Sequence, residues 1–472
     1  MKTWLERRGI ASNVLPKKWS TIGLVENLEP MRPLPKSDEE RVREFQRKLY
    51  QKAKQEKGFR FYVLYDKISL PHFLREAYRR VRSNRGSPGV DGMTFEAIEA
   101  RGLEDFLAEI ADELKTENYR PSPVLRRMIP KANGKERPLG IPTIKDRTVQ
   151  MSCKLVIEPI FEADFEECSY GFRPKRSSKD AIEEIKSALL AGKTDVFDGD
   201  LSSYFDTIPH DKLLIALEQR ISDRKILKLI KLWLKAPVSE NGRMTGGKKS
   251  KMGTPQGGVI SPLLANVYLH LVDRIVMRKD GYFRLKGIQM IRYADDFVLL
   301  GRKISLEALQ RLEKVLTRMG LTLNKEKSRQ LDARSHGFDF LGFNFRHRWS
   351  RKQYRQKYWH VAPSRKSVLK VTASLRELFG EFQHLGAQDF VRMLNEKARG
   401  WTNYFNIPGV SHPFQSFERL RWYLDKKLTG YYRKKSQRGS KLYCQHGYDG
   451  FVKEFGLIDP VLTLRRRLPA NA

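Results

Sequence analysis

Apolar residues recur along the chain with two different periods. A spacing of three or four positions, typical of an amphipathic helix, predicts helices over residues 38–50, 70–81, 211–234, 306–320 and 417–428. Short runs rich in β-branched and aromatic residues lie between these stretches and are typical of strands. The pattern predicts an α+β fold whose last third is helical.

The ends of two helices are marked by capping residues. Ser37 precedes three acidic residues that complement the positive end of a helix dipole, so we expect a helix to begin there. Ser305 is the expected N-cap of another helix, and Gly320 is expected to end it. We interpret residues 211–234 as one long helical stretch that supplies core.

Two β-hairpins are predicted from paired apolar runs. In residues 126–142 the runs are joined by Asn133-Gly134, a strong hairpin signal. In residues 291–300, which read Ile-Arg-Tyr-Ala-Asp-Asp-Phe-Val-Leu-Leu, the runs flank a polar corner. The second hairpin therefore carries the neighbouring carboxylates of Asp295 and Asp296 at its tip.

These carboxylates are the first candidates for chemistry. Asp295 and Asp296 would repel each other without a cation, and paired carboxylates suit a hard ion such as Mg²⁺. The alternative is a solvated turn, where Asp is common. A third carboxylate, Asp200, follows a short strand-like run. Three carboxylates can hold two metal ions roughly 3.5–4 Å apart, which favours nucleotidyl transfer to a 3′-hydroxyl.

The charge of the chain predicts a polyanionic partner. Among 472 residues, 90 Lys and Arg stand against 55 Asp and Glu, which gives a net charge of +35. Nucleic acid is expected, because neutralised phosphates release condensed counterions. The alternative is a basic protein at a membrane surface. The sequence has no apolar run of about 18 residues and no lipidation signal, so no membrane partner is expected.

The cysteines and the first residues bear on the compartment. The start of the chain lacks the apolar core of a signal peptide. Cys153, Cys168 and Cys444 are odd in number and scattered, so they show no metal-site spacing and are interpreted as packing residues. We expect a cytoplasmic protein, in the bacterial cytoplasm or nucleoid.

Several basic loops are candidate phosphate contacts. Residues 84–92 form a Gly-rich loop in which backbone can approach phosphates, or an ordinary loop. Lys131 and Arg137 flank the Asn-Gly turn, where the alternative is a surface hairpin with solvated charges. Residues 169–178 interleave aromatics with cations, as a strand-binding surface would, although the aromatics can equally be core.

Two segments that carry the candidate carboxylates resemble the palm of reverse transcriptases. They are Tyr-Ala-Asp-Asp at residues 293–296 and Asp-x-x-x-Tyr-Phe at residues 200–205. Residues 253–264, Gly-Thr-Pro-Gln-Gly-Gly-Val-Ile-Ser-Pro-Leu-Leu, closely resemble the fourth motif of these enzymes. Residues 321–328 and 337–343 resemble the last two motifs.

A further motif narrows the resemblance to group II intron reverse transcriptases. Gly-Trp-x-Asn-Tyr-Phe at residues 400–405 is similar to the thumb of group II intron maturases, known as domain X. The alternative is an ordinary basic helical bundle. Residues 84–92 resemble an insertion in the fingers of the same family, and the order of all motifs agrees with it.

The resemblance implies a right-handed polymerase fold, with α+β fingers and palm and an α-helical thumb. We expect an N-terminal extension over residues 1–69 and fingers and palm over residues 70–350. The thumb or maturase domain X is expected over residues 351–436, and a basic tail, a candidate DNA-binding segment, over residues 437–472.

The resemblance also implies roles for single residues. Asp200, Asp295 and Asp296 would be catalytic and would bind two Mg²⁺ ions, with Mn²⁺ as a substitute. The implied nucleotide-binding residues are Lys131, Arg137, Phe205, Gln256 and Lys325, of which Phe205 would exclude a 2′-hydroxyl. The implied nucleic-acid-binding residues are Arg85, Arg173, Lys175, Arg176, Arg365, Lys366, Arg399, Trp401 and Tyr404.

The implied reaction is RNA-directed DNA synthesis from deoxynucleoside triphosphates on an RNA template with a DNA primer. By resemblance, the protein binds group II intron RNA, assists its splicing and, during retrohoming, reverse transcribes it after its insertion into target DNA. A domesticated reverse transcriptase in DNA repair or phage defence is an alternative. So is a non-catalytic splicing factor.

The end of the sequence departs from the fullest family pattern. Only Cys444 and His446 lie together there, without the second Cys pair of a His-Asn-His nuclease. We therefore expect a member without that nuclease, whose primer comes from elsewhere, for example from a nascent strand in replication.

Overall fold

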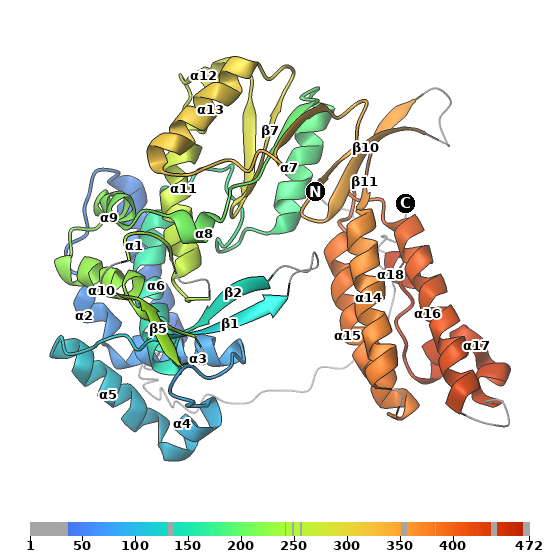
Figure 1. Cartoon of the computed structure of the whole chain (residues 1–472), viewed down its shortest axis with the longest axis horizontal. Coiled ribbons are helices and arrows are strands. Elements are labelled where there is room, and N and C mark those ends of the chain that lie inside the picture. Colours follow the sequence, from blue (N-terminus) through green and yellow to red (C-terminus); the bar gives the residue numbers. More distant parts are fainter. Residues whose placement is uncertain are drawn as a thin grey trace, which may run out of the picture. The chain divides into compact units, whose positions relative to one another are not determined.

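The computed structural model contains helices and strands in its first two thirds and mainly helices at its end (Figure 1). These elements pack through buried apolar side chains. The structure describes residues 36–130, 136–240, 242–247, 250–254, 257–350, 356–382, 384–435 and 441–465. Asp38–Ala472 forms one compact unit.

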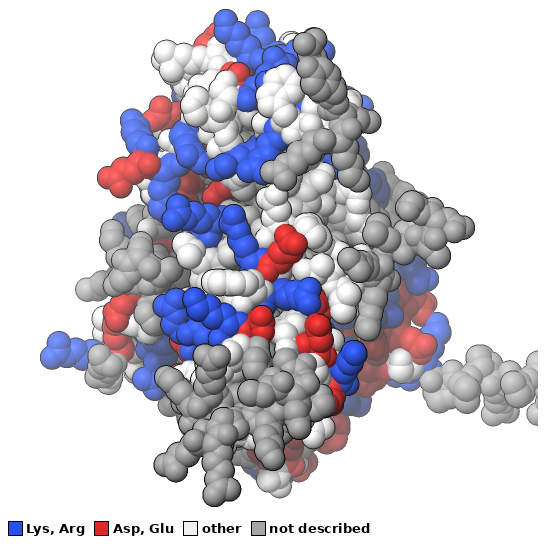
Figure 2. Space-filling view, turned by 90° about the vertical axis from the view of Figure 1, so that its right-hand side faces the viewer, with Lys and Arg blue, Asp and Glu red and all other residues white. Residues whose placement is uncertain are grey.

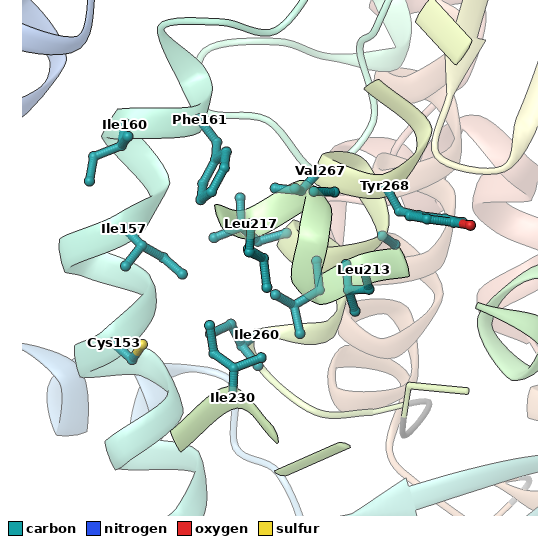
Figure 3. Close-up of a cluster of buried hydrophobic side chains, with 14 of the residues drawn as sticks. Cys153, Ile157, Ile160, Phe161, Leu213, Leu217, Ile230, Ile260, Val267 and Tyr268 are labelled. Atoms are coloured by element: carbon teal, nitrogen blue, oxygen red, sulfur yellow. The ribbon is translucent and has the colours of Figure 1, made fainter. Parts of the chain in front are cut away.

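The first elements surround α6 (Ile144–Glu162), a helix most of whose residues are buried, polar ones such as Asp146, Arg147 and Gln150 included. Cys153 and Ile157 of α6 point toward Leu217 (Figure 3). The other elements of this part are α1 (Asp38–Gln55), α2 (Tyr65–Ile68), α3 (Pro71–Ser83), α4 (Phe95–Arg101), α5 (Leu103–Lys115), β1 (Val124–Pro130) and β2 (Glu136–Ile141).

The middle of the chain alternates helices and strands. Its elements are α7 (Ser178–Leu190), β3 (Asp195–Gly199), α8 (Tyr204–Thr207), α9 (His210–Glu218), α10 (Arg224–Leu234), β4 (Pro237–Glu240), β5 (Arg243–Gly246), α11 (Ser261–Met277), α12 (Tyr282–Leu285), β6 (Gln289–Tyr293), β7 (Asp296–Gly301), α13 (Leu306–Met319) and β8 (Arg329–Asp332).

The last third begins with three strands and continues in helices. Its elements are β9 (Phe338–Phe340), β10 (Phe343–Trp349), β11 (Lys357–Pro363), α14 (Arg365–Glu381), α15 (Ala387–Phe405), α16 (Phe414–Lys435), α17 (Lys441–Glu454) and α18 (Leu462–Arg465). One buried cluster joins these strands, α15 and α16 to α7 and the β6–β7 hairpin. A second cluster lies within the helices of the last third.

Three sheets organise the strands. Their orders are β2-β1-β4-β5, β6-β7-β3-β8 and β11-β10-β9. In the second sheet, β3 lies between β7 and β8 and is antiparallel to both. The end of β3 therefore lies beside the turn that joins β6 to β7.

Most of the predicted elements are confirmed. The structure contains the helices expected at residues 38–50, 70–81, 306–320 and 417–428 and both hairpins. The Ser305 hydroxyl accepts a hydrogen bond from Ala308 N, and Gly320 ends that helix with φ +76°. Cys153 and Cys168 are buried packing residues, as predicted.

The prediction of one helix over residues 211–234 is wrong. Two helices, α9 and α10, cover this stretch, because the chain between them makes long-range contacts instead. Ile221 forms a bridge with Phe61. The Asp223 carboxylate caps α10 and also accepts hydrogen bonds from the backbone N–H groups of Leu64 and Tyr65, each at 2.9 Å.

In the part of the chain that the structure describes, no helix is both long enough and apolar enough to cross a bilayer.

Candidate catalytic site

The sheet β6-β7-β3-β8 brings the predicted carboxylates to one place. Asp200 follows β3, and Asp295 lies in the turn between β6 and β7. Both line a pocket of about 470 Å³, together with residues 201–206 around α8 and Asn324 and Lys327 ahead of β8. Glu136 and Pro138 of the β1–β2 hairpin complete the lining.

The turn that carries Asp295 is tight and strained. Tyr293 pairs with Asp296, so the turn has only two central residues, Ala294 and Asp295. Ala294 has φ +58°, a left-handed conformation that costs a residue other than glycine about 1–2 kcal/mol. Such strain persists only where the surroundings hold the backbone in place.

The buried side chain of Arg292 holds this turn in place. Its side chain is fully buried and forms an ion pair with the equally buried Asp273 through two hydrogen bonds of 2.8 and 2.5 Å. Nη1 donates to the carbonyl oxygen of Ala294 at 2.8 Å and to Asn266 Oδ1 at 3.0 Å. Nη2 also donates to Ser169 Oγ at 2.7 Å. A buried, fully bonded guanidinium therefore fixes the carbonyl next to Asp295.

Gly171 supports the turn from a second side. The Asn266 side-chain amide, already bonded to Arg292, donates to Gly171 O at 2.8 Å. A Cβ atom on Gly171 would clash with Ala294 N and stand 2.9 Å from the carbonyl carbon of Tyr293. Glycine is thus needed here because two backbones pass in direct contact.

The backbone of Asp200 is bonded to the segment before β8. Asp200 N donates to Ser328 Oγ at 3.1 Å, and Asn324 N donates to Asp200 O at 2.8 Å. The Lys327 ammonium lies 3.1 Å from Asp200 Oδ2. Lys327 is thus the basic residue that the tertiary structure places against a candidate catalytic carboxylate.

Burial and neighbouring carboxylates raise the pKa of Asp296. Loss of hydration, followed by the charges of Asp295, Asp200 and Asp198, raises the pKa of Asp296 to about 6, against a smaller opposing effect of Lys327. Asp296 is exposed to solvent. Asp200 and Asp295 line the pocket, whereas Asp296 is not among its lining residues.

Asp198 is a member of the carboxylate cluster that our sequence reasoning missed. Burial is the main cause that raises its pKa to about 6, and Asp200 and Asp339 add to the rise while Arg329 opposes it. The signal was present in the sequence, because alternate positions of a strand share a face and Asp198 precedes Asp200 by two.

The cluster fits a divalent cation in donor chemistry and in charge. Hard cations such as Mg²⁺ prefer carboxylate oxygens. Loss of hydration, with a further effect of neighbouring carboxylates, raises the pKa of Asp296 and of Asp198, and a cation would stabilise their charged forms. Within the described part of the chain, no three His, Cys, Asp or Glu side chains are already arranged around a single metal position. The ammonium of Lys327 instead lies against Asp200.

Phe205 lies in the same pocket. Its ring is half-buried and meets the buried ring of Tyr204 edge to face, with centroids 5.5 Å apart. The Tyr204 hydroxyl donates to Ala265 O at 2.6 Å, which anchors α8 to α11. The ring of Phe205 therefore has a defined position beside Asp200.

The predicted nucleotide contacts have different outcomes. Lys131, Gln256 and the side chain of Arg137 lie outside the described residues. The predicted nucleotide contact of Lys325 is corrected, because the structure does not bring this residue into the pocket. Its side chain is 83% exposed and its ammonium lies 3.5 Å from Glu313 of α13, while Lys327 lines the pocket. Lys325 and Lys327 are two residues apart in one short turn, and their side chains point in different directions.

Three of the predicted nucleic-acid contacts are corrected. The buried Arg173 guanidinium is bonded to Glu162 and to two backbone carbonyls, so it is structural. Trp401 packs against Phe405 and Phe417 in the core. Tyr404 is packed in the same cluster, and its hydroxyl donates to Leu341 O at 2.9 Å.

The other predicted nucleic-acid contacts lie on the surface. Arg176 is paired with Glu167, and its guanidinium lies 5.3 Å from the centroid of Tyr170. Tyr170 is buried and Phe172 is exposed, so both interpretations of that segment apply, each to one residue. The exposed cations are Arg85, Lys175, Arg365, Lys366 and Arg399.

Comparisons with known protein families give two matches. Residues 129–345 match the family model described as "Reverse transcriptase (RNA-dependent DNA polymerase)". Residues 368–444 match the model described as "Group II intron, maturase-specific domain". The first match includes β3 and the β6–β7 hairpin, and the second includes α15 and α16.

Individual relatives agree with these matches. Protein YkfC of Escherichia coli (strain K12) is 39% identical over 350 residues, which are 66% of this chain and 90% of YkfC. Group II intron-encoded protein LtrA of Lactococcus lactis subsp. cremoris is 38% identical over 219 residues, 46% of this chain but only 36% of LtrA. A chain of the "Partial Cas6-RT-Cas1--Cas2 complex" is 23% identical over 54% of this chain and 41% of that chain, with a TM-score of 0.33, too low to support an argument.

The contact between Gly171 and the turn predicts that Gly171→Ala slows nucleotidyl transfer. The new Cβ must push the backbone of Ala294, which displaces Asp295. We expect a roughly 10- to 100-fold lower turnover number, because misplacement of a catalytic group by about 1 Å has effects of this size. Gly380→Ala is the control, since a Cβ at Gly380 meets nothing within 4 Å. Equal turnover of the two variants in primer extension would contradict the prediction.

The raised pKa values predict that the metal-free chain loses stability as the pH rises. Asp198 and Asp296 ionise near pH 6 in the folded chain but near 3.8 when unfolded, so their stabilising effect is complete below about pH 4 and is lost as the pH rises through about 6. In EDTA, we expect the melting temperature to fall from pH 5 to pH 7.5, and less so in Asp198→Asn. Asp206→Asn is the control, and an unchanged fall in Asp198→Asn would refute the assignment.

Proposed function

Because the chain belongs to the family of group II intron reverse transcriptases and maturases, we propose that Asp200, Asp295 and Asp296 carry its RNA-directed DNA synthesis. One observation supports this most strongly. Asp200 from the end of β3 and Asp295 from the β6–β7 turn line one pocket, and loss of hydration together with the charges of these two carboxylates and of Asp198 raises the pKa of Asp296.

The cofactor is a proposal of the same kind. Divalent metal ions are typical of reverse transcriptases, and we propose Mg²⁺, with Mn²⁺ as a substitute, held by Asp200, Asp295 and Asp296. When bound, two such ions would lower the pKa of the primer 3′-hydroxyl and neutralise charge on the leaving pyrophosphate. Lys327 would then leave Asp200 and its ammonium would be free for triphosphate oxygens.

The remaining pocket residues orient the substrates in this proposal. Arg292, Asn266 and Gly171 keep Asp295 in place through the backbone of the turn, so the carboxylates need not reorganise during the reaction. Phe205 lies beside Asp200, where its ring would occupy the space of a ribose 2′-hydroxyl. Lys131, Arg137 and Gln256 remain the predicted contacts to the triphosphate and the nascent base pair.

The maturase-specific segment implies binding to intron RNA. We propose that the chain binds its own group II intron RNA, promotes its splicing and copies it during retrohoming. Exposed cations of α14 and α15, Arg365, Lys366 and Arg399, are the proposed contacts to RNA phosphates. These whole-protein roles are proposals also because the match covers 36% of LtrA.

The proposed polymerase activity predicts the effect of charge removal in the pocket. With a DNA primer, an RNA template, deoxynucleotides and Mg²⁺, we expect Asp295→Asn with Asp296→Asn to lose extension by about 1,000-fold or more, since ion binding and its charge stabilisation are lost. Asp206→Asn removes a carboxylate from the same pocket lining and should extend nearly as the native chain does.

The outcomes of this experiment separate the alternatives. If the native chain extends no primer while it binds structured RNA tightly, the chain acts as a splicing factor without polymerase activity. If Asp206→Asn fails like the double variant, the carboxylate roles are assigned to the wrong residues. RNA binding is measured on the same samples, so that unfolding cannot be mistaken for loss of chemistry.

The position of Phe205 predicts sugar selection. Phe205→Ala opens space for a 2′-hydroxyl, so we expect the ratio of kcat/KM for deoxynucleotides to that for ribonucleotides to fall roughly 10- to 100-fold. Phe205→Tyr keeps the ring and should keep the ratio. Single-nucleotide incorporation measures both values. An unchanged ratio in Phe205→Ala would mean that another side chain excludes the 2′-hydroxyl.

A further inference from the structure

An open groove of about 820 Å³ lies along β8 and β10, outside the catalytic pocket. It is lined by residues 329–337 and by Arg346 and His347, and it shares no lining residue with the catalytic pocket. We propose that this groove, with the adjacent Trp349, binds an unpaired nucleic-acid strand in addition to the template and primer. The proposal goes beyond the polymerase function and does not depend on it.

The charges of the groove favour phosphate. Arg329, Arg334 and Arg346 contribute guanidinium groups, which suit the fork-like recognition of phosphate oxygens. Within the described part of the chain, no carboxylate lies within 4 Å of the guanidinium of Arg334 or Arg346, and Arg329 has only a distant partner, Asp198, at 3.8 Å. The one described acid in the lining, Asp332, accepts a hydrogen bond from the backbone N–H of Arg334 at 2.9 Å.

The wall formed by β8 adds backbone groups. β8 is the last strand in the order β6-β7-β3-β8, so one of its edges has no neighbouring strand in that sheet. Such an edge presents N–H groups outward. Backbone donors beside guanidinium groups are typical of surfaces that follow a phosphate backbone without reading its sequence.

An exposed indole provides a place for a base. Trp349, the last residue of β10, is 63% exposed, and the Lys357 ammonium lies 4.6 Å from its ring centroid. His347, two residues earlier and thus on the same face of the strand, lines the groove and stacks on Trp359 with a centroid distance of 4.6 Å. The groove therefore continues into an aromatic and cationic surface, the combination that binds unpaired strands.

The same features argue against other polyanions. A duplex offers phosphates but no free base face for Trp349, and an acidic protein segment would not need an exposed indole beside a cation.

Figure 2 looks onto the side of the molecule where β10 and β11 lie in Figure 1, and blue side chains gather in its upper part. RNA and DNA share the required chemistry, and the test distinguishes them.

The test measures a second strand bound to the full chain. Unlabelled template–primer is added in excess to fill the polymerase site, and a labelled unpaired oligonucleotide of about 12 nucleotides is titrated by fluorescence anisotropy at several salt concentrations. RNA and DNA of the same sequence are compared. We expect binding that persists in the presence of template–primer, and the tighter of the two strands identifies the source.

Charge reversal at the groove should weaken this binding in a characteristic way. In Arg334→Glu with Arg346→Glu, the slope of log K against log salt should become shallower by about 1.4, or about 0.7 for each lost phosphate contact. The control, Arg284→Glu with Arg318→Glu, reverses the charge of two exposed arginines that do not line the groove. Trp349→Ala should weaken binding roughly 10-fold with an unchanged slope, because stacking carries no counterion release.

Two results would overturn the proposal. One is loss of all oligonucleotide binding by the native chain when template–primer is in excess. The other is a groove variant whose affinity and salt slope equal those of the control. Primer extension on a short template is measured in parallel and should be unchanged in both double variants, so failure of the groove proposal and failure of the polymerase assignment are distinguishable.

Discussion

The turn that carries Asp295 depends on one buried ion pair. Arg292 and Asp273 are both inaccessible to solvent, and the guanidinium uses its remaining donors on Asn266, Ser169 and the carbonyl oxygen of Ala294. A buried pair adds little net stability compared with a well-packed apolar pair, but loss of one partner costs about 3–5 kcal/mol. Its contribution here is therefore positional: it holds a two-residue turn with a strained alanine in a single geometry.

The two sides of that turn have opposite electrostatics. On the buried side of the turn, every donor of Arg292 has a partner and the charge of Asp273 is neutralised. On the other side of the turn, loss of hydration and the charges of neighbouring carboxylates raise the pKa of Asp198 and of Asp296 to about 6, and Arg329 and Lys327 oppose the rise. A rigid and neutral support thus carries an acidic surface, and groups perturbed in this way are typical of functional sites.

Aromatic residues join the strands of the last third to its helices. Tyr404 donates to Leu341 O, the Phe343 and Phe405 rings lie 4.7 Å apart, and Trp401 packs against Phe417. The Lys186 ammonium of α7 also donates to the carbonyl oxygens of Gly409 and Val410. The motif at residues 400–405 therefore positions the helices of the last third against the strands.

The sequence by itself determined the local elements and the main carboxylates. Periodicity placed α1, α3, α13 and α16, caps marked the ends of α13, and the apolar runs on each side of Asp295 and Asp296 indicated the hairpin that carries them. These signals are complete within a few neighbouring residues, because helix capping and strand alternation act over one or two turns of chain. Family motifs added the reaction, since their order along the chain survives without any knowledge of contacts.

Only the tertiary structure decided which side chains meet. The partners of Arg292 are 19, 26 and 123 residues away in the chain, and nothing near Arg292 in sequence indicates them. The same holds for Lys327 rather than Lys325 at Asp200, for Asp223 in the break between α9 and α10, and for the burial of Arg173 and Trp401. Long-range packing selects among equivalent local patterns, so a charged or aromatic residue becomes a ligand contact or a core residue only when the fold has closed around it.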